Sequence, residues 1–443
     1  MARGELFDPV FGGHALGAEL SDRAWISAML EVEAGLARAV AATGRISGAD
    51  AAEITAAAGR LAERLDPAVL GAEGVGGGNP VIPLVARLRA ECSGAGVPAA
   101  AVHTGATSQD VIDTALMLLA RRSGALVVGD LAAAADAAAA LAAAHRDTPM
   151  AARTLGQQAL PTTFGALAAG WCAGLDRAAQ TLAAVLGSLP VQFGGAAGTL
   201  AALHPNGFDV ADALAAELGL ARQGVPWHTD RVRIGELASA LGVAAGAVAK
   251  PATDVVSMAA TELGEVAEDA PGGSSAMPHK RNPVAAVTAR AAACRVPGLV
   301  ATVLGNMDHE FARAAGAWHA EWETVTDLLR LTGGAAHRLA DCLDGLHVDA
   351  AAMRRNLDAT GGMLLAERVT GALAGYTDSA RAFVTAACAA GRPLDADPEV
   401  TQYLDPATVR ELLDPAGYLG HAGDLVDRVL AGRDTRSIKE NTP

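Results

Sequence analysis

A long stretch without proline, from Thr107 to His145, constrains the fold more than any other feature of this sequence. The stretch is rich in alanine and leucine, which are strong helix formers. A continuous helix over this range would span roughly 55 to 60 Å, at a rise of about 1.5 Å per residue. Helices of this length pack against neighbours of similar length, so the stretch predicts a helical bundle.

Other helical stretches support the bundle. Apolar residues three and four positions apart from Trp25 to Val40, after a capping Ser21 and before Gly44, indicate an amphipathic helix. Longer stretches are expected over residues 162–186, 231–268, 283–310 and 318–343, the second of them interrupted by Pro251. Abundant alanine allows the helices to approach closely, and no series of strands separated by turns is present. We predict an all-α chain with a central bundle of five long helices.

The size and composition favour a large folded chain. Its 443 residues exceed what one hydrophobic core usually covers, and 51% of them are hydrophobic whereas 19% are charged. We expect an N-terminal helical domain over residues 1–106, the long bundle over residues 107–345 and a C-terminal helical domain over residues 346–443.

The charge and the cysteines exclude several classes of protein. A formal net charge of −15 would repel phosphate backbones, so we expect no nucleic-acid partner. The five cysteines are scattered and form no CxxC pair, which indicates neither a disulfide framework nor a zinc site. The N-terminus lacks a secretory signal, and charges interrupt the alanine-rich runs. These features predict a cytoplasmic protein that does not enter a membrane, in which an anionic substrate needs a local cluster of positive groups.

Two polar segments between the expected helices are candidates for anion binding. The run Gly74–Pro80 can bring backbone amides close to a ligand near Asn79, although a flexible turn before a helix starting near Val81 would look the same. The run His103–Asp110 sets a histidine and the hydroxyls of Thr107 and Ser108 at the start of the longest helix. Helix N-termini favour anions, and helix capping is compatible with that role.

The most polar segment between apolar helices is Gly272–Pro283, which combines two glycines, two serines and three basic side chains. A serine can act as a base only if its alkoxide is stabilised. Backbone amides, Lys280 and the N-terminus of the following helix could stabilise an alkoxide at Ser274. A solvated basic turn is the alternative interpretation of this composition.

The same segment resembles the signature of the fumarase/aspartase superfamily, Gly-Ser-Ser-x-x-Pro-x-Lys-x-Asn, and matches it at every position. Resemblance continues in family order over Leu30–Ala34, His103–Asp110, Arg153–Thr163 and Phe193–Thr199. Four further segments resemble the bacterial carboxymuconate lactonizing branch: Gly78–Leu84, Arg313–Glu323, Asn356–Gly362 and Leu413–Gly420.

The resemblance implies a three-domain helical subunit, a homotetramer around a twenty-helix core, and active sites that each combine three subunits. It implies no cofactor and no metal. Ser274 would be the catalytic base and Lys280 a second catalytic group that contacts a substrate carboxylate. The substrate contacts that it implies are Asn79, His103, Thr107, Ser108, Thr154, Gln157, Gln158, Ser275, Met277, His279, Asn282 and Arg313.

One further candidate is His228, which directly precedes the long stretch that starts at residue 231. His228 could line the substrate pocket, whereas Thr229 or Asp230 is suited to capping the helix.

A departure from the superfamily bears on the reaction. Adenylosuccinate lyases have a histidine where Leu155 stands and another in the segment that Asn79 replaces, so two proton donors are missing here. An amine needs a general acid to leave, whereas a carboxylate, with a reference pKa of about 4, does not. The resemblance therefore implies lactonization of 3-carboxy-cis,cis-muconate, a tricarboxylate diene of aromatic catabolism, through an aci-carboxylate intermediate.

Other members of the superfamily remain as alternatives. Nitrite is also a weakly basic leaving group, so a nitrosuccinate-type lyase would suit the same residues. Adenylosuccinate cleavage fits less well because it needs the missing acid. A catalytically silent scaffold resembling the lens proteins of the superfamily is the alternative outside catalysis, and the presence of Ser274, Lys280 and Asn282 argues against it.

Overall fold

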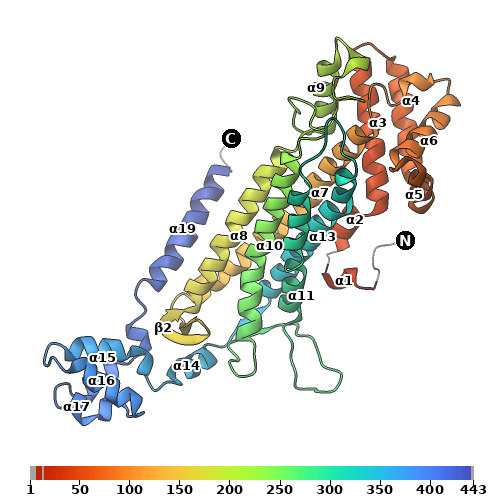
Figure 1. The fold of residues 1–443 in the computed structure, drawn as a ribbon. Coiled ribbons are helices and arrows are strands. Elements are labelled where there is room, and N and C mark those ends of the chain that lie inside the picture. The colour runs from red at the N-terminus through yellow and green to blue at the C-terminus, as the bar shows by residue number, and fades with distance from the viewer. Residues whose placement is uncertain (1–5, 12–13, 441–443) are drawn as a thin grey trace. The chain divides into compact units, whose positions relative to one another are not determined.

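The structure, a computed structural model, describes residues 6–11 and 14–440 and is built almost entirely from helices (Figure 1). The helices are α1 (Asp8–Phe11), α2 (His14–Glu19), α3 (Asp22–Ala42), α4 (Gly48–Arg64), α5 (Pro67–Gly74), α6 (Val81–Ser93), α7 (Ser108–Ala144), α8 (Phe164–Gly187), α9 (Gly207–Leu218), α10 (Val232–Met258), α11 (Val284–Ala293), α12 (Val296–Gly305), α13 (Ala317–Asp344), α14 (Ala350–Asp358), α15 (Ala366–Leu373), α16 (Ala380–Ala389), α17 (Pro398–Thr401), α18 (Pro406–Leu412) and α19 (Ala422–Glu440). The strands are β1 (Pro149–Thr154), β2 (Gln157–Thr163), β3 (Val266–Glu268) and β4 (Leu346–Val348), which pair antiparallel as β1–β2 and β3–β4.

The backbone forms two compact units. The first unit comprises Met1–Ala132, Arg177–Ala249 and Thr288–Arg338, and the second comprises Ala133–Asp176, Lys250–Val287 and Leu339–Pro443, each within the described residues. The long helices α7, α8 and α10 contribute residues to both units. The division into three domains stays a prediction.

The long helices agree with the sequence analysis except where proline is involved. Helices α7, α8 and α13 lie within two residues of the expected ranges. The stretch 283–310 is two helices, because Pro297 cannot donate a backbone N–H and its ring clashes with the carbonyl of Ala293. Helix α10, in contrast, continues through Pro251 and ends at Met258, ten residues before the expected end. The expected interruption at Pro251 was therefore wrong, and so was the expected end of this helix.

Small residues let the long helices pack closely in the first unit. A side chain at Gly124 of α7 would clash with Leu186 of α8, and one at Gly242 of α10 would press on Val300 of α12. A side chain at Gly333 of α13 would likewise meet Val127 of α7. Glycines thus allow the helices to approach closely at these contacts, whereas the role expected for alanine stays a prediction.

The N-terminal helices of the first unit are amphipathic. Ser21 caps α3 by accepting a hydrogen bond from the amide of Ala24, as the sequence predicted. The apolar stripe of α3, including Met29, Leu36 and Val40, is buried. Gly35 on the same helix allows Leu218 of α9 to pack against the α3 backbone.

The second unit holds the β1–β2 hairpin, the signature loop and the C-terminal helices. Helices α15 to α18 enclose a small core around Val369, Leu373 and Val400. The last helix, α19, is fixed by Arg433, whose guanidinium bonds Asp136 at 2.7 Å and Asp176 at 2.9 Å.

Three helical segments are long and apolar enough to cross a membrane when judged by length and composition alone: Ser108–Ala144, Val232–Met258 and Val284–Gly305. Their most apolar windows are only 33%, 50% and 28% buried within the chain. The bundle therefore carries apolar surface that the folding of one chain leaves uncovered.

Candidate active site

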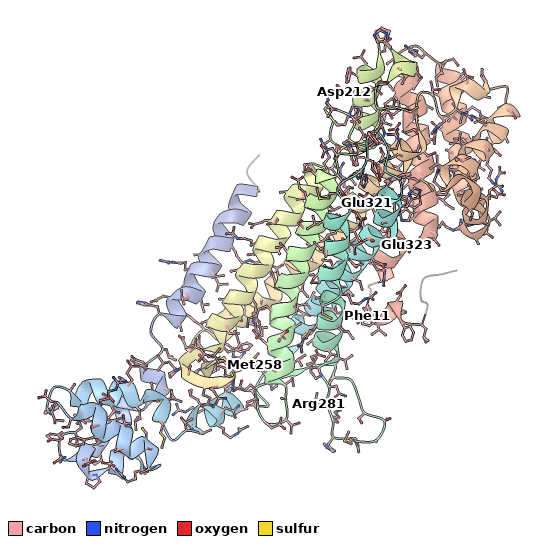
Figure 2. The ribbon with its side chains drawn as sticks, viewed as in Figure 1. Phe11, Asp212, Met258, Arg281, Glu321 and Glu323 are labelled. Carbon is pink, nitrogen blue, oxygen red and sulfur yellow. The ribbon has the colours of Figure 1, made fainter. Side chains whose placement is uncertain are left out.

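The signature loop runs from Gly272 to Pro283 in the second unit, between β3 and α11, and Arg281 marks it in Figure 2. Its base is closed by two backbone hydrogen bonds of 2.9 Å that Gly272 and Asn282 exchange. The side-chain amide of Asn282 also donates to the carbonyls of Gly272 and Gly273, at 3.2 Å each. Asn282 therefore holds the loop together within the chain, and its predicted contact with substrate stays a prediction.

Within this loop, the hydroxyl oxygen of Ser274 is approached by two backbone amides. Its Oγ accepts hydrogen bonds from the amides of Ala276, at 3.3 Å, and Met277, at 3.1 Å. Backbone donors aimed at a hydroxyl oxygen stabilise the deprotonated form. The neighbouring candidates Ser275, Met277, His279 and Lys280 are exposed on the same loop.

A buried glutamate, which the sequence analysis missed, anchors the end of the loop. The carboxylate of Glu268, only 5% exposed, accepts the amides of Ala285 at 3.1 Å and Ala286 at 2.8 Å. It thus caps α11 directly after the signature. Burial, reinforced by Glu268, raises the pKa of the nearby Cys342 thiol, which keeps that thiol protonated.

The β1–β2 hairpin carries three more candidates. Its tip places Leu155 and Gly156 at φ 52° and 79°, the left-handed pair of a tight hairpin turn. Thr154 and Gln157 flank this pair and are exposed. Leu155 is fully exposed, although it is apolar and has a left-handed backbone conformation.

The strand residues directly next to the hairpin tip are tied to α14 and to Glu265. Arg153 bonds both oxygens of the fully buried Glu265, at 2.8 and 2.6 Å. Asn356 donates to the same carboxylate at 2.8 Å, and its carbonyl accepts the side-chain amide of Gln158 at 2.7 Å. The side-chain amide nitrogen of Gln158 therefore makes a hydrogen bond within the chain, and the contact of Gln158 with substrate stays a prediction.

In the first unit, the carboxylate of Asp110 joins three segments at the start of α7. One oxygen accepts the amides of Thr107 at 3.0 Å and Gly195 at 2.9 Å. The other accepts the amide of Gly194 at 3.0 Å and lies 2.6 Å from Nε2 of His228. Asp110 is only 1% exposed, so these bonds are shielded from water. Sequence reasoning missed Asp110, although it ends the segment that pointed to Thr107 and Ser108.

His228 is buried beneath this arrangement. Its ring lies against Gly194, where a side chain would clash with the imidazole and with Pro226. The following helix is capped by Asp230, which accepts the amide of Val232 at 3.2 Å. His228 therefore contacts the loop at Gly194. Its own contact with substrate stays a prediction.

Arg313 lies on the other side of the same glycine loop. Its guanidinium donates to the carbonyls of Gly195 at 2.6 Å and Ala196 at 3.2 Å. Burial lowers the pKa of Arg313, and Asp110 and Asp113 oppose that effect. The structure thus brings Arg313 and the Thr107 turn together around Gly195.

His103 is held in an unusual conformation at the same end of the unit. Its φ of 63° is left-handed, and its Nδ1 lies 2.6 Å from the buried carboxylate of Glu33. Burial disfavours the charged ring, but Glu33 outweighs this effect and raises the pKa of His103. A protonated His103 would add positive charge beside the Thr107 turn.

The Asn79 turn completes the candidates of the first unit. Asn79 Oδ1 accepts the amide of Val81 at 3.1 Å, and Gly78 has a φ of 70° that favours glycine. The nearest group to a side chain at Gly78 would be Nε2 of His319, at 3.7 Å. His319 is therefore a further candidate, and only its place in the segment Arg313–Glu323 hinted at it.

An ionic network fixes the helices below these residues. The buried guanidinium of Arg231 bonds Asp113 of α7 at 2.8 Å and Glu321 of α13 at 2.5 Å. Trp318 donates to Asp113 at 3.0 Å and is buried. Figure 2 marks Glu321 on α13. The described part of the chain contains no cluster of three His, Cys, Asp or Glu that could hold a metal ion.

Comparison with known proteins gives a consistent result. A family model described as lyase matches residues 12–298. Nitrosuccinate lyase from Streptomyces davaonensis is 47% identical, over 97% of this chain and 95% of that protein. 3-Carboxy-cis,cis-muconate cycloisomerase from Pseudomonas aeruginosa is 45% identical, over 96% of each chain. The crystal structure of 3-carboxy-cis,cis-muconate lactonizing enzyme from Pseudomonas putida superposes with a TM-score of 0.91 at 41% identity, covering 97% of this chain and 99% of that one.

The superfamily, the mostly helical fold and the enzymatic class expected from the signature are therefore confirmed. The chain belongs to the lyase family of the fumarase/aspartase superfamily and is an enzyme of the lyase and cycloisomerase type.

Proposed function

We propose that this enzyme is a 3-carboxy-cis,cis-muconate cycloisomerase, with Ser274 as its proton-transfer group. The observation that carries the proposal is the pair of amides, from Ala276 and Met277, directed at Ser274 Oγ within a complete signature loop. The absence of a proton donor at Leu155 supports a leaving group that departs without protonation.

The reaction follows from these two features. One substrate carboxylate oxygen attacks the conjugated double bond, a C–O bond forms, and the π electrons move to the adjacent carbon. That carbanion is stabilised as an aci-carboxylate by the neighbouring carboxyl group. Ser274 Oγ–H then donates its proton to this carbon, and the amides of Ala276 and Met277 stabilise the resulting alkoxide until it takes a proton from solvent.

The remaining candidates would hold the carboxylates. A chain of net charge −15 needs local cations to bind a trianion, and Lys280, Arg313 and a protonated His103 supply them. Thr107 and Ser108 add hydroxyls at the start of α7, where the helix dipole favours anions.

A homotetramer with shared active sites is part of the proposal. The uncovered apolar surface of the long helices supports it, with Val232, Val243 and Leu304 between 46% and 54% exposed. Monomeric soluble proteins rarely leave such continuous apolar surface open, and packing against other copies would cover it. The similarity to crystallised metabolic enzymes supports a soluble protein, and we place it in the cytoplasm because its five cysteines form no disulfide within the described residues.

Nitrosuccinate lyase is the second candidate, favoured by the relative at 47% identity. Nitrite, like a carboxylate, leaves without a general acid, so the same serine would suffice. Ser274 would then act in the opposite direction and remove a proton.

The two candidates are separated by parallel incubation of the pure protein with 3-carboxy-cis,cis-muconate and nitrosuccinate. We expect loss of the diene absorbance with the first and little release of nitrite from the second. Ser274→Ala should retain its fold and lose turnover by at least about a thousandfold, since the chemical step depends on this group. Ser257→Ala, on the exposed surface of α10, is the control. Rapid nitrite release without diene loss would reject the cycloisomerase, and a fully active Ser274→Ala would reject the mechanism.

A further inference from the structure

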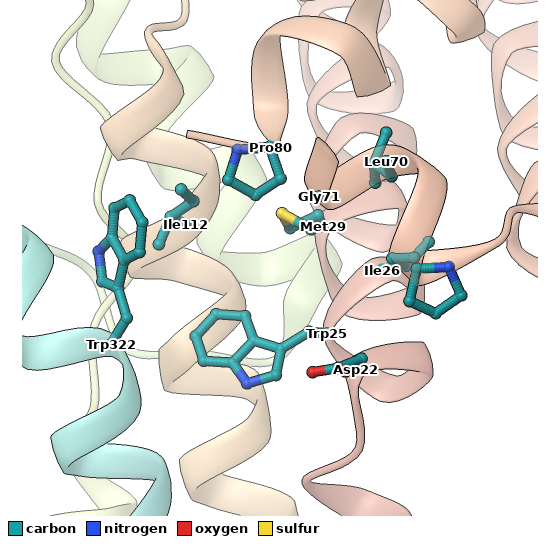
Figure 3. A pocket seen from close by; sticks show the side chains of 10 residues that line it. Asp22, Trp25, Ile26, Met29, Leu70, Gly71, Pro80, Ile112 and Trp322 are labelled. Carbon is teal, nitrogen blue, oxygen red and sulfur yellow. The ribbon is translucent and has the colours of Figure 1, made fainter. Parts of the chain in front are cut away.

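A carboxylate lies on the core-facing side of α3, where the helical pattern calls for an apolar residue. Ile26, Met29, Glu33, Leu36 and Val40 follow one another at spacings of three and four, and all five are buried. Figure 3 shows Ile26 and Met29 at an apolar cavity of about 270 Å³, one to two helical turns before Glu33. Glu33 itself is only 1% exposed. A charged group at such a position is costly unless a specific partner compensates it.

The partner of Glu33 is His103, which begins the turn that leads to Thr107. Glu33 Oε1 lies 2.6 Å from His103 Nδ1, and Glu33 Oε2 is buried without a hydrogen-bond partner among the described residues. The Glu33 side chain is fully buried, whereas the His103 side chain is 14% exposed. No group in the described part of the chain forms a hydrogen bond with His103 Nε2. Nε2 is therefore the ring nitrogen that remains for a ligand.

The backbone of His103 adopts a conformation that needs support from its surroundings. Its φ of 63° is left-handed, and a residue other than glycine keeps such a conformation only where neighbouring groups hold it. The short contact with Glu33 supplies this hold, and the amide of Ala106 donates to the His103 carbonyl at 3.4 Å. Glu33 thus fixes both the place and the direction of the imidazole ring.

Charged groups from three elements act on His103: Glu33 of α3, Asp110 of α7 and Arg89 of α6. Burial lowers the pKa of the ring, and Glu33 outweighs burial. Asp110 adds to the effect of Glu33 and Arg89 opposes it, so the pKa of His103 lies above its ordinary value of 6.5. Asp110 also acts on Arg313, so one buried carboxylate interacts with two cations that can bind an anion.

We propose that Glu33 is a positioning residue for substrate binding, which holds His103 so that its Nε2–H donates to a carboxylate of the substrate. The inference rests on the proposed function, which supplies a substrate with three carboxylates. His103 takes no part in the proton transfer of the reaction. Its contact is made in the ground state and in the transition state alike, so it affects binding more than the chemical step. Nitrosuccinate also carries carboxylates, so the same contact would serve the second candidate.

Substrate binding should depend on pH in a defined direction. His103 is charged below its folded pKa, so binding is strongest at lower pH and weakens as the pH rises through the folded pKa. In Glu33→Gln the ring loses the group that raises its pKa and is neutral near about pH 7. We expect the KM of this variant to be about tenfold higher near that pH, the effect of losing a hydrogen bond from a charged donor, with kcat changed much less. The difference should shrink toward about pH 9, where both rings are neutral.

Two further variants at α3 separate positioning from a purely structural role. Glu31→Gln, which removes an exposed carboxylate paired with Arg122, is the matched control and should keep the KM of the natural sequence at every pH. Glu33→Asp keeps a carboxylate beside the ring and should retain part of the pH dependence. A Glu33→Gln protein with the KM of the natural sequence from about pH 6 to 9 would overturn the proposal.

A double-mutant cycle tests whether Glu33 acts through His103. His103→Asn removes the cation, suits a left-handed backbone and leaves Glu33 unchanged. We expect this variant to raise the KM near about pH 7 as much as Glu33→Gln does and to abolish the pH dependence. Addition of Glu33→Gln to His103→Asn should then cause no further rise. Effects that simply add would reject the positioning role.

Failure of this contact is distinguished from failure of the proposed function by measuring binding apart from turnover. Calorimetry with Ser274→Ala uses 3-carboxy-cis,cis-muconate and, separately, succinate, which has two carboxylates and neither a diene nor a nitro group. If the natural sequence lacks lactonizing activity, the proposed function fails. An affinity for either probe that falls toward about pH 9 and is lowered by Glu33→Gln would still support the His103 contact. In an active enzyme, affinities that do not change with pH would overturn the contact and leave the proposed function intact.

Discussion

Among the side chains of the candidate site, the carboxylate of Asp110 has a structural role that requires no contact with the substrate. Asp110 accepts hydrogen bonds from Thr107, Gly194 and Gly195 and contacts His228. A single buried carboxylate thus fixes the start of α7 and the glycine loop whose carbonyls accept hydrogen bonds from Arg313. An ionised carboxylate is suited to this position because it offers about four acceptor sites and no donor.

His103 and Glu33 form a buried pair whose stabilising effect depends on pH. Glu33 raises the pKa of His103 above its ordinary value of 6.5. The folded state therefore binds the proton more tightly than the unfolded state does. The contribution is complete below the unfolded pKa and is lost as the pH rises through the folded pKa.

We therefore expect the Tm difference between the natural sequence and Glu33→Gln to be largest near about pH 6 and to shrink toward about pH 9. Thermal unfolding across this range measures it. Glu31→Gln, on the same helix, removes an exposed ion pair with Arg122 that contains no histidine, and should give a constant difference. A Glu33→Gln difference that is equally constant would show that His103 is not charged in the folded state.

Among the elements, the signature loop and the hairpin are each tied by a buried glutamate. Glu268 caps the helix after the loop, and Glu265 binds Arg153, which lies next to the tip of the hairpin. The tips themselves are exposed. Buried hydrogen bonds next to an exposed tip hold the backbone of that tip in a fixed position.

Removal of the Glu268 cap should affect catalysis more than stability alone explains. We expect Glu268→Ala to lower the free energy of unfolding by about 1 to 2 kcal/mol, as for other lost caps, and to lower kcat because the loop loses its anchor. Asp405→Ala removes a cap with two similar bonds from α18 and should cost similar stability without a loss of kcat. Equal effects of both variants on kcat would assign Glu268 a purely structural role.

At the scale of the whole molecule, the composition of the long helices is compatible with two environments, a membrane and an assembly of several copies. Their length and hydropathy suit a membrane, and their partial burial suits an assembly of several copies. The buried network of Arg231, Asp113 and Glu321, at one end of α7, α10 and α13, argues for the assembly, since charged side chains are costly within lipid.

A charged side chain introduced on the uncovered apolar surface of α10 should dissociate the assembled copies of the chain. Val243 on α10 is 54% exposed, and we expect Val243→Glu to yield smaller species with the same helix content and little activity. Light scattering after gel filtration, together with circular dichroism, measures both. Val225→Glu, on an equally exposed residue outside the long helices, should remain assembled. A Val243→Glu protein of unchanged mass would reject α10 as an interface.

The sequence by itself determined what depends on near neighbours along the chain. Helix α7 follows from a proline-free apolar run, the Ser21 cap from the residue type before α3, and the membership of the superfamily from a contiguous signature. These features rest on hydrogen bonds and periodicity within a few residues, so they can be inferred without the fold.

Only the tertiary structure decided which distant residues meet. Pro251 lies inside α10, whereas Pro297 lies in the first turn of α12, although both residues are proline. Asp110 reaches His228 across 118 positions, and Arg153 reaches Glu265 across 112. No local sequence pattern predicts such pairs, because the two residues meet only when the packing of the helices brings distant parts of the chain together. The physical reason is that a buried charge is tolerated only where the completed fold supplies its partners.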